Sequence, residues 1–359
     1  MVFVPQQDME GSFEDALKNA KLTHAVFPSQ LCEDIGLDAM LDTDIETEQR
    51  IRSIMEQAHD PDRFLFQMQS LVQAHLLEAR EALRAGCVAA IDGTDALRPV
   101  TFMNTTAYAV AIGCVTSQAR SNPHIQITTT NAEHIRTRRV KHASIDELGR
   151  LCDVLDHGRF ERSWPSTFRE YHEREVALQS GVPIVLIDGP VWTQDLISQP
   201  SGRALYDRMQ GSSQKFFGVI KDLRNSWTLS KWCGYSLRTG EGYVIGPVRT
   251  QLQTHFSHRG EVTKWIDGLP EEYVRVVFRP QQKAFGLECR LGDLPLAMAI
   301  LQEDASPTIN HELPLLLEII DAQVRAGFDG ALASDAVISR LQQMDYRRAV
   351  DVTGERDYR

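Results

Sequence analysis

Two short stretches of the sequence each place an aspartate and a glycine directly after an apolar run. Residues 88–94 read Val-Ala-Ala-Ile-Asp-Gly-Thr, and residues 184–190 read Ile-Val-Leu-Ile-Asp-Gly-Pro. An acid at the C-terminal end of a buried strand is held rigidly, and the glycine after it allows close approach of a ligand. Paired carboxylates on adjacent strands suit a hydrated divalent cation. Asp92 and Asp188 are therefore candidate metal ligands, with a plain Asp-Gly turn as the alternative for each.

A third carboxylate is expected from the helix before the second of these strands, predicted over residues 166–180. The helix runs antiparallel to the strand, so its N-terminal half lies near the strand end that bears Asp188. A strand rises about 3.3 Å per residue and a helix about 1.5 Å per residue, so the helical position that lies level with Asp188 is near residue 168. Glu170 and Glu173 are favoured over Glu175 because they share a helix face. The alternative is a solvated, salt-bridged face.

Basic residues supply further candidates. Lys221 closes a predicted strand at 216–220, where it would reach the same sheet end as the two aspartates and meet phosphate or transition-state charge. The segment 134–142 concentrates positive charge in an acidic chain, which favours contact with a phosphate backbone. Its candidate contacts are Arg136, Arg138, Arg139 and Lys141. A surface lysine cap and a solvated loop are the plainer alternatives.

Composition limits the classes of protein that fit. The chain has 359 residues and a net charge of -11, and an acidic protein on average repels nucleic acid. A cation bound by clustered carboxylates and a local basic segment would offset that average. The apolar runs are far shorter than the ~20 residues of a membrane-spanning helix, and residues 1–10 do not resemble a secretion signal. The scattered cysteines lack metal-binding spacing, so we expect a cytoplasmic protein with no membrane association.

The order of predicted elements indicates a mixed α/β fold. Residues 1–85 are predicted to be helical. Residues 243–256 are compatible with a flexible arm or with a dimer loop. The predicted strands lie at 87–91, 101–115, 124–130, 183–187, 216–220, 273–278 and 284–289. The predicted later helices lie at 144–156, 166–180, 202–210, 294–302, 313–326 and 331–344. Three successive strands followed by helix–strand repeats exclude a TIM barrel and a purely parallel doubly wound sheet.

Taken in order, these segments resemble the NurA family of nucleases over residues 86–330. The matching motifs are the strand into Asp92-Gly93-Thr94, Arg169-x-x-x-Glu173, the strand into Asp188-Gly189, Gly218-Val219-Ile220-Lys221, and Leu313-Pro314 followed by Asp321. The resemblance implies an RNase H-like mixed sheet core. Residues 1–85 would flank it as a helical region, and residues 331–359 as a C-terminal helix and polar tail.

The resemblance also implies an activity and partners. NurA proteins are manganese-dependent DNA nucleases that form homodimers and work with a hexameric HerA-type ATPase in DNA end processing or antiphage defence. By this resemblance Asp92, a helix glutamate and Asp188 bind metal, and Asp321 stands where the family often has a histidine. Leu313 replaces a tyrosine of the same motif. Mn²⁺ and Mg²⁺ both suit an all-oxygen site.

Two other functions fit part of the pattern. Residues 91–94 are close to the phosphate loop of sugar-kinase and actin-like ATPases, but no glycine-rich adenosine motif follows, and no GxxxxGK[ST] loop is present. A catalytically weak RNase H-like scaffold that regulates a DNA motor would account for the departures at Leu313 and Asp321. The nuclease hypothesis accounts for the largest number of the candidate residues.

Overall fold

The structure is a computed structural model, and the chain divides into two compact units, Met1–Ile54 and Met55–Arg359. It describes residues 37–57, 63–101, 105–133, 144–147, 150, 160–223, 227–257, 260–305, 314–328, 333, 335–337 and 339–340. Helix α3 (Leu37–Gln57) contains the described part of the first unit. The second unit contains the sheet and every candidate site residue that the structure describes. None of the described helices combines the length and apolar character needed to cross a membrane.

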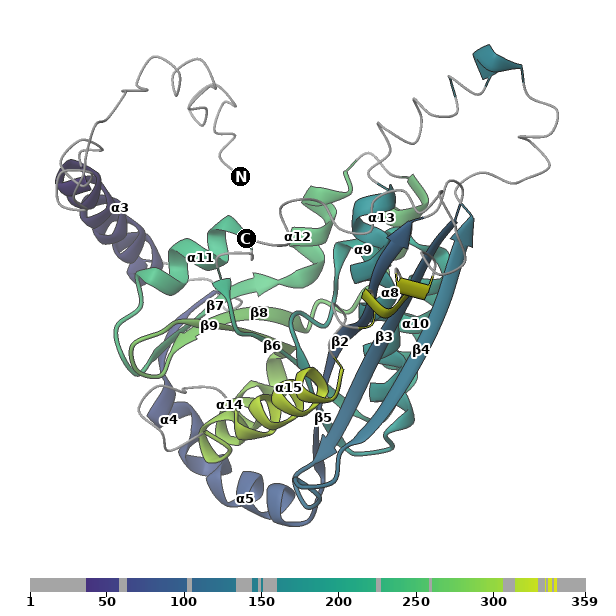
Figure 1. Cartoon of the computed structure of the whole chain (residues 1–359). Helices are drawn as coiled ribbons and strands as arrows, with labels where there is room; N and C mark the ends of the chain where they lie inside the picture. Colours follow the sequence, from purple (N-terminus) through teal and green to yellow (C-terminus); the bar gives the residue numbers. More distant parts are fainter. Residues whose placement is uncertain are drawn as a thin grey trace, which may run out of the picture. The chain divides into compact units, whose positions relative to one another are not determined.

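A nine-stranded mixed sheet forms the centre of the second unit (Figure 1). Its strand order is β1-β7-β8-β9-β6-β5-β2-β3-β4. The strands are β1 (Leu65–Gln67), β2 (Val88–Thr101), β3 (Thr105–Thr116), β4 (His124–Glu133), β5 (Ile184–Asp188), β6 (Lys215–Ile220), β7 (Glu241–Pro247), β8 (Tyr273–Arg279) and β9 (Phe285–Arg290).

Strands β2 to β6 form the half of the sheet that bears the candidate site. Strands β2, β3 and β4 are an antiparallel meander, whereas β5 pairs parallel with β2 and β6 pairs parallel with β5. Helix α8 (Phe160–Gln179) precedes β5, and helices α9 (Gln194–Ser198) and α10 (Pro200–Gly211) connect β5 to β6. This order, β4-β3-β2-β5-β6, is the RNase H-like arrangement that the family resemblance implies.

The pairing of β2 with β5 places the two aspartates next to each other. The register matches Ile91 with Ile187, so Asp92 and Asp188 are the next residues on adjacent parallel strands. Both apolar runs are buried, as expected for parallel strands that are covered on both faces. The sequence repeat therefore has a structural meaning, because the two similar apolar runs pair with each other and reach Asp92 and Asp188 at the same level of the sheet, where β5 ends and β2 continues.

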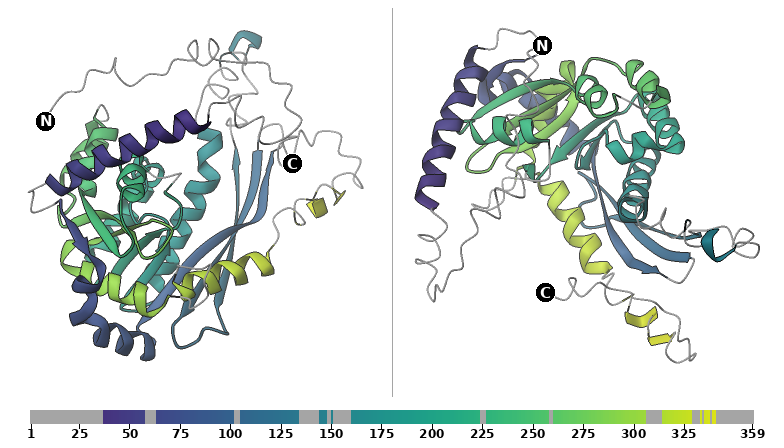
Figure 2. Two further views of the ribbon diagram at one scale, coloured as in Figure 1. Left: turned by 90° about the vertical axis from the view of Figure 1, so that its left-hand side faces the viewer. Right: turned by 90° about the horizontal axis from the view of Figure 1, so that it is seen from above.

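Alternation along these strands separates two apolar layers. Ala90, Leu186 and Val219 face a layer that includes α14 (Leu294–Glu303) and α15 (Leu315–Gly327). Ile91 and Ile187 face the other layer, which includes α8 and α10. Figure 2 shows helices on both sides of the sheet. Because side chains alternate with a period of two, the face occupied by each charged residue at the strand ends follows from these core residues.

The remaining strands extend the sheet beyond β6, where β9 pairs antiparallel with it. Helices α4 (Met68–Val72) and α5 (Leu76–Arg84) precede β2. The later helices of this half are α11 (Thr228–Tyr235), α12 (Val248–His255) and α13 (Gly260–Asp267).

Two sequence predictions are wrong in this half of the sheet. Residues 243–256 form no flexible arm, because most of β7 is buried between β1 and β8 and α12 follows it directly. Residues 65–67, expected to be helical, form β1. The apolar residues around Phe66 have spacing compatible with a helix, but Phe66 packs over Gly242 of β7 in the paired strands. Tertiary pairing overrides the local pattern here.

Gly113 allows α15 to approach the sheet beside Asp92. It is the partner of Asp92 across the β2–β3 pair, and a Cβ at Gly113 would lie 2.4 Å from atoms of both Ile320 and Val324. We expect Gly113→Ala to push α15 outward and lower the free energy of unfolding by about 1–3 kcal/mol, as measured by urea unfolding. Gly211→Ala is the matched control, because a Cβ there meets no atom within 4 Å. Equal stability of both variants would contradict this packing.

Candidate metal centre

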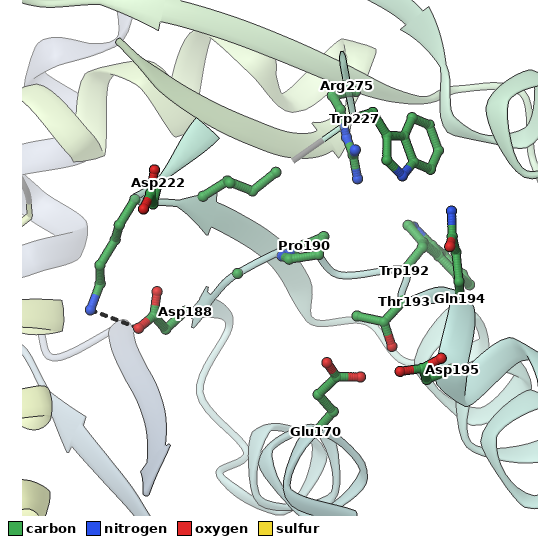
Figure 3. Close-up of a pocket in the computed structure, with 13 residues that line it drawn as sticks. Glu170, Asp188, Pro190, Trp192, Thr193, Gln194, Asp195, Asp222, Trp227 and Arg275 are labelled. Carbon is green, nitrogen blue, oxygen red and sulfur yellow. Dashed lines mark ion pairs between the residues drawn. The ribbon is translucent and has the colours of Figure 1, made fainter. Parts of the chain in front are cut away.

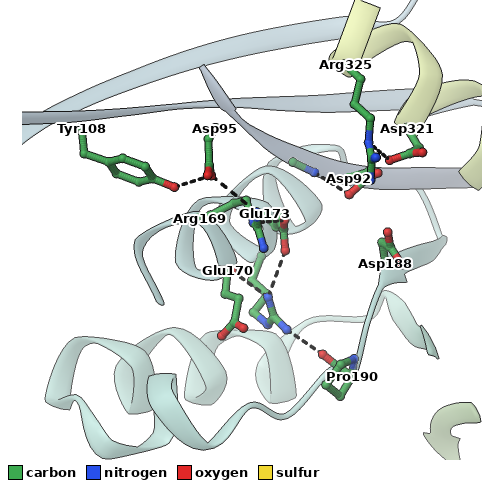
Figure 4. Close-up of polar contacts among 12 residues, drawn as sticks. Asp92, Asp95, Tyr108, Arg169, Glu170, Glu173, Asp188, Pro190, Asp321 and Arg325 are labelled. Carbon is green, nitrogen blue, oxygen red and sulfur yellow. Dashed lines mark hydrogen bonds and ion pairs between the residues drawn. The ribbon is translucent and has the colours of Figure 1, made fainter. Parts of the chain in front are cut away.

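Three aspartates from separate elements meet where β5 ends beside β2 (Figure 4). Asp92 lies in β2, Asp188 ends β5 and Asp321 lies on α15, and one carboxylate oxygen of each lies within 4.8 Å of the others. Asp92 is buried, while the other two are half-buried. Asp92 and Asp188 have the strand parity of Ala90 and Leu186, so both face the layer that contains α15.

Nearby groups hold each carboxylate in place. Asp92 accepts the backbone N–H of Gly93 at 2.8 Å. The Nζ of Lys221 lies 2.7 Å from Asp188 and 4.0 Å from Asp92, and Arg325 forms an ion pair with Asp321 at 2.7 Å. Lys221 follows β6 with the parity of Val219, the β6 partner of Asp188. The structure thus places Lys221 at the sheet end where the sequence predicts it.

The protein alone does not balance the negative charge of this cluster. Burial raises the pKa of Asp92 to about 9, and repulsion from the Asp188 carboxylate adds to the effect, while the Lys221 ammonium opposes it. At neutral pH Asp92 therefore keeps its proton when protein groups alone surround it. Three converging carboxylate oxygens are a suitable donor set for a hard divalent cation, which would replace that proton with stronger positive charge.

Glu173 lies on the opposite side of β2 from the aspartates. A Cβ on Gly93 would lie 2.7 Å from its Oε1, and because adjacent residues point to opposite faces, Asp92 points away from that contact. Arg169 and Arg174 flank the Glu173 carboxylate at 3.6 and 3.4 Å. Burial raises the pKa of Glu173 to about 7, against the lowering effect of Arg174 and then Arg169.

Glu170 and Glu175 have different neighbours, as their spacing along α8 predicts. Glu170 lines a cavity that also contacts Asp188 (Figure 3). Glu175 instead pairs with Arg208 and accepts a hydrogen bond from Tyr171. Neither Glu170 nor Glu173 belongs to the carboxylate group within 4.8 Å, which among the described residues consists of the three aspartates.

Arg174 ties α8 to the loop that follows Asp188. Its guanidinium is buried and donates hydrogen bonds to the backbone oxygens of Val191 at 3.0 Å, Pro190 at 2.6 Å and Glu170 at 2.7 Å. The glycine between Asp188 and Pro190 has φ of 94°, a conformation that favours glycine. The arginine and this turn together fix the direction in which the chain leaves β5, and hence the position of Asp188.

Sequence reasoning missed a second polar group beside Glu173. Asp95 accepts the hydroxyl of Tyr108 at 2.6 Å and lies 3.5 Å from Arg169. Asp95 follows Asp92 by three residues, but its partners come from β3 and α8, and no local spacing connects them. The group links the Asp92 strand to α8 through Arg169.

Several candidate residues lie outside the described part of the chain. These are Arg136, Arg138, Arg139 and Lys141 of the basic segment, together with Leu313 of the late motif. Their predicted roles stay predictions. Asp321, from the same late motif as Leu313, is described and lies in the cluster.

Comparisons with known proteins concern the fold. No protein-family model matches the sequence, and no curated protein matches it. The NurA nuclease of Sulfolobus solfataricus is 10% identical, with 76% of this chain and 95% of that chain covered and a TM-score of 0.43. The fold resembles that of NurA nucleases.

Two further solved structures match this chain with lower TM-scores than the first. A NurA bound to dAMP and manganese is 8% identical over 76% of this chain and 95% of its own, with a TM-score of 0.40. Endonuclease V of Ciona intestinalis in complex with DNA is 12% identical over 67% of this chain and 84% of its own, with a TM-score of 0.28. At these identities the likeness concerns fold, and the chemistry of the site must be judged from its own side chains.

The buried arginine gives a stability prediction. Arg174→Met should lower the free energy of unfolding by about 3–5 kcal/mol, because it leaves Glu173 and the bonded backbone oxygens without their cation. Arg208→Met removes an ion pair whose arginine side chain is 54% exposed, and it should cost about 1 kcal/mol or less. Urea unfolding at one pH and temperature compares the two. Similar losses in both variants would argue against Arg174 as the buried clamp.

The raised pKa of Asp92 gives a pH prediction for the metal-free protein. The folded state binds this proton more tightly than the unfolded state, whose aspartate pKa is about 3.9, so stability should fall as the pH rises and level off above about 9. Asp92→Asn removes this contribution. Thermal unfolding of both proteins in EDTA from pH 5 to 10 should show the variant gaining stability relative to the natural chain. A constant difference across that range would contradict the raised pKa.

Proposed function

We propose that this chain is a metal-dependent nuclease that hydrolyses phosphodiester bonds in DNA. The observation that supports this best is the convergence of Asp92, Asp188 and Asp321 beside Lys221, where β5 ends next to its parallel neighbour β2. This arrangement offers hard oxygen ligands with a cation next to them. It suits a substrate that carries negative charge and reacts by attack of water.

The aspartates would hold one or two divalent ions, Mn²⁺ or Mg²⁺. When bound, such ions lower the pKa of water and offset charge on a phosphodiester and its leaving oxygen. Asp321 supplies a carboxylate at the place where the NurA family often has a histidine, so this departure leaves a metal-binding group at the site. We assign Asp92, Asp188 and Asp321 as ligands.

Lys221 is assigned to the phosphate. The nearby carboxylates Asp188 and Asp92 raise its pKa, against the lowering effect of burial, so Nζ carries its charge at neutral pH. From 2.7 Å beside Asp188, this ammonium is positioned to donate hydrogen bonds to phosphate oxygens and to offset charge that grows during hydrolysis.

Glu173 is assigned a supporting role. Its carboxylate is 5% exposed and is held between Arg169 and Arg174 behind the Asp92 strand. It holds α8 against β2 and contributes negative potential at Asp92. Glu170 lines the cavity beside Asp188.

The acidic character of the chain supports dependence on partners. A net charge of -11 weakens general attraction to DNA. We propose that the basic segment 134–142 contacts the DNA backbone. On the basis of the order of motifs, we further propose a homodimer that works in the cytoplasm with a HerA-type hexameric ATPase, in DNA end processing or antiphage defence.

The proposed activity can be tested with end-labelled single- and double-stranded DNA. We expect the purified chain, with and without a co-purified ATPase, to digest DNA in Mn²⁺ and to lose activity in EDTA. Asp92→Asn and Asp188→Asn should each reduce the rate by roughly 10²-fold or more, since even supporting residues of metal sites often cost 10- to 100-fold. Asp146→Asn changes an exposed aspartate and serves as the control.

Calorimetry and an ATPase assay distinguish the alternatives. Loss of Mn²⁺ binding in Asp188→Asn, with a normal unfolding curve, supports the ligand assignment. Full nuclease activity in Asp92→Asn would overturn it. A chain that binds no metal and cuts no DNA would favour the scaffold, and ATP hydrolysis by the isolated chain would favour the phosphotransferase.

A further inference from the structure

A cavity of about 540 Å³ opens directly beside Asp188 and Lys221. Figure 3 shows Asp188 on one side of it and Trp192, Gln194 and Asp195 on the other. The volume is in the range of small-molecule sites and suits a single nucleoside, whereas a DNA duplex is far too wide. A nucleotide whose phosphate lies at Asp188 and Lys221 has its sugar and base within reach of this cavity.

One wall of the cavity is a prearranged flat surface. The guanidinium of Arg275 lies 4.0 Å from the ring centroid of Trp227. The buried carboxylate of Glu288 accepts a hydrogen bond from the Nε of Arg275 at 2.9 Å, and its other oxygen accepts the backbone N–H of Trp192 at 3.1 Å. One carboxylate therefore fixes residues on two sides of the cavity. Indole rings and guanidinium planes are the surfaces on which unpaired bases stack.

The other walls contain polar groups that lack partners. The Nε1 of Trp192, whose residue is 3% exposed, and the Oε2 of Glu170 are buried and form no hydrogen bond within the described part of the chain. Both residues line the cavity. Burying such atoms without a partner costs free energy. Neither atom has accessible surface, but Glu170 as a whole is half-buried and its carboxylate points into the cavity (Figure 3), where it offers an acceptor to a ligand.

The charge of the cavity argues against a second phosphate there. Glu170, Asp195 and Asp222 line it, and the charge of Arg275 is already paired with Glu288. Away from Lys221, the walls thus present more acceptors than available cations. A neutral, flat group with N–H donors fits this environment better than an anion does.

We propose that this cavity is a subsite for a nucleobase next to the cleaved phosphodiester, and that it favours adenine and cytosine over thymine. Trp227 and Arg275 provide the stacking wall, and Glu170 accepts a hydrogen bond from an exocyclic amino group. Carboxylates accept from cytosine N4, and the amide of Gln194 can pair with adenine. Thymine presents a carbonyl oxygen where the other two bases present an amino group, and it would face the Glu170 carboxylate unfavourably.

This inference rests on the proposed nuclease function for its meaning, but its first test needs no cleavage. Nucleosides without phosphate are titrated into the full chain and followed by ligand-observed NMR. We expect 2′-deoxyadenosine and 2′-deoxycytidine to bind at least roughly fivefold more tightly than thymidine. Equal affinity for the three nucleosides, or no binding, would overturn the subsite.

Three variants locate the binding. Trp227→Leu should weaken binding of all the nucleosides roughly fivefold or more, whereas Trp232→Leu, a 45% exposed tryptophan outside the cavity, should leave it unchanged. Glu170→Gln replaces an acceptor with an amide that can also donate, so the preference against thymidine should shrink toward none. Equal effects of the two tryptophan variants, or an unchanged preference in Glu170→Gln, would contradict the assignment.

DNA cleavage then separates the two proposals. In Mn²⁺, the product ladder from a mixed-sequence single strand should be stronger at adenine and cytosine than at thymine, and Glu170→Gln should remove this difference. Asp92→Asn should abolish the ladder while nucleoside binding remains. Selective nucleoside binding by a chain that cuts no DNA would sustain the subsite and overturn the nuclease. An active nuclease that cuts without base preference and binds the nucleosides equally would support the nuclease and overturn the subsite.

Discussion

The confinement of three acidic side chains in one partly buried cluster is the constraint around which this part of the molecule is built. Asp92, Asp188 and Asp321 approach within 4.8 Å, and burial together with repulsion raises the pKa of Asp92. Rigid elements must hold such groups together. The in-register parallel pair β2–β5 fixes the first two, and Gly113, opposite Asp92, lets α15 bring the third close to the sheet.

Buried charged side chains also fix the loop after β5. Arg174 is fully buried but is bonded to three backbone oxygens, so its charge is compensated while it fixes the turn at Gly189. That turn continues into Trp192, whose backbone is held by Glu288. One loop therefore positions a carboxylate of the candidate metal centre at its start and a wall of the adjacent cavity a few residues later.

Local sequence patterns predict the central strands because these are long apolar runs that end in Asp-Gly. They also place Glu170 and Glu173 near the level of the strand ends, since helix and strand rise fix that level. They do not specify the face. Alternation along β2 puts Glu173 behind the strand, in contact with the position of Gly93 rather than within the aspartate cluster, and this depends on the layer to which each helix belongs.

The features that could not be predicted from the sequence all depend on contacts between distant segments. Strand β1 and the cavity wall formed by Trp227 and Arg275, which Glu288 supports, have no local signature, because their partners lie far along the chain. The acidic net charge, which alone argues against DNA, gains a different meaning from the cluster. Under the proposed function, a bound cation turns this acidic cluster into a point that attracts a phosphate, so DNA affinity should depend on metal more steeply than in a basic nuclease.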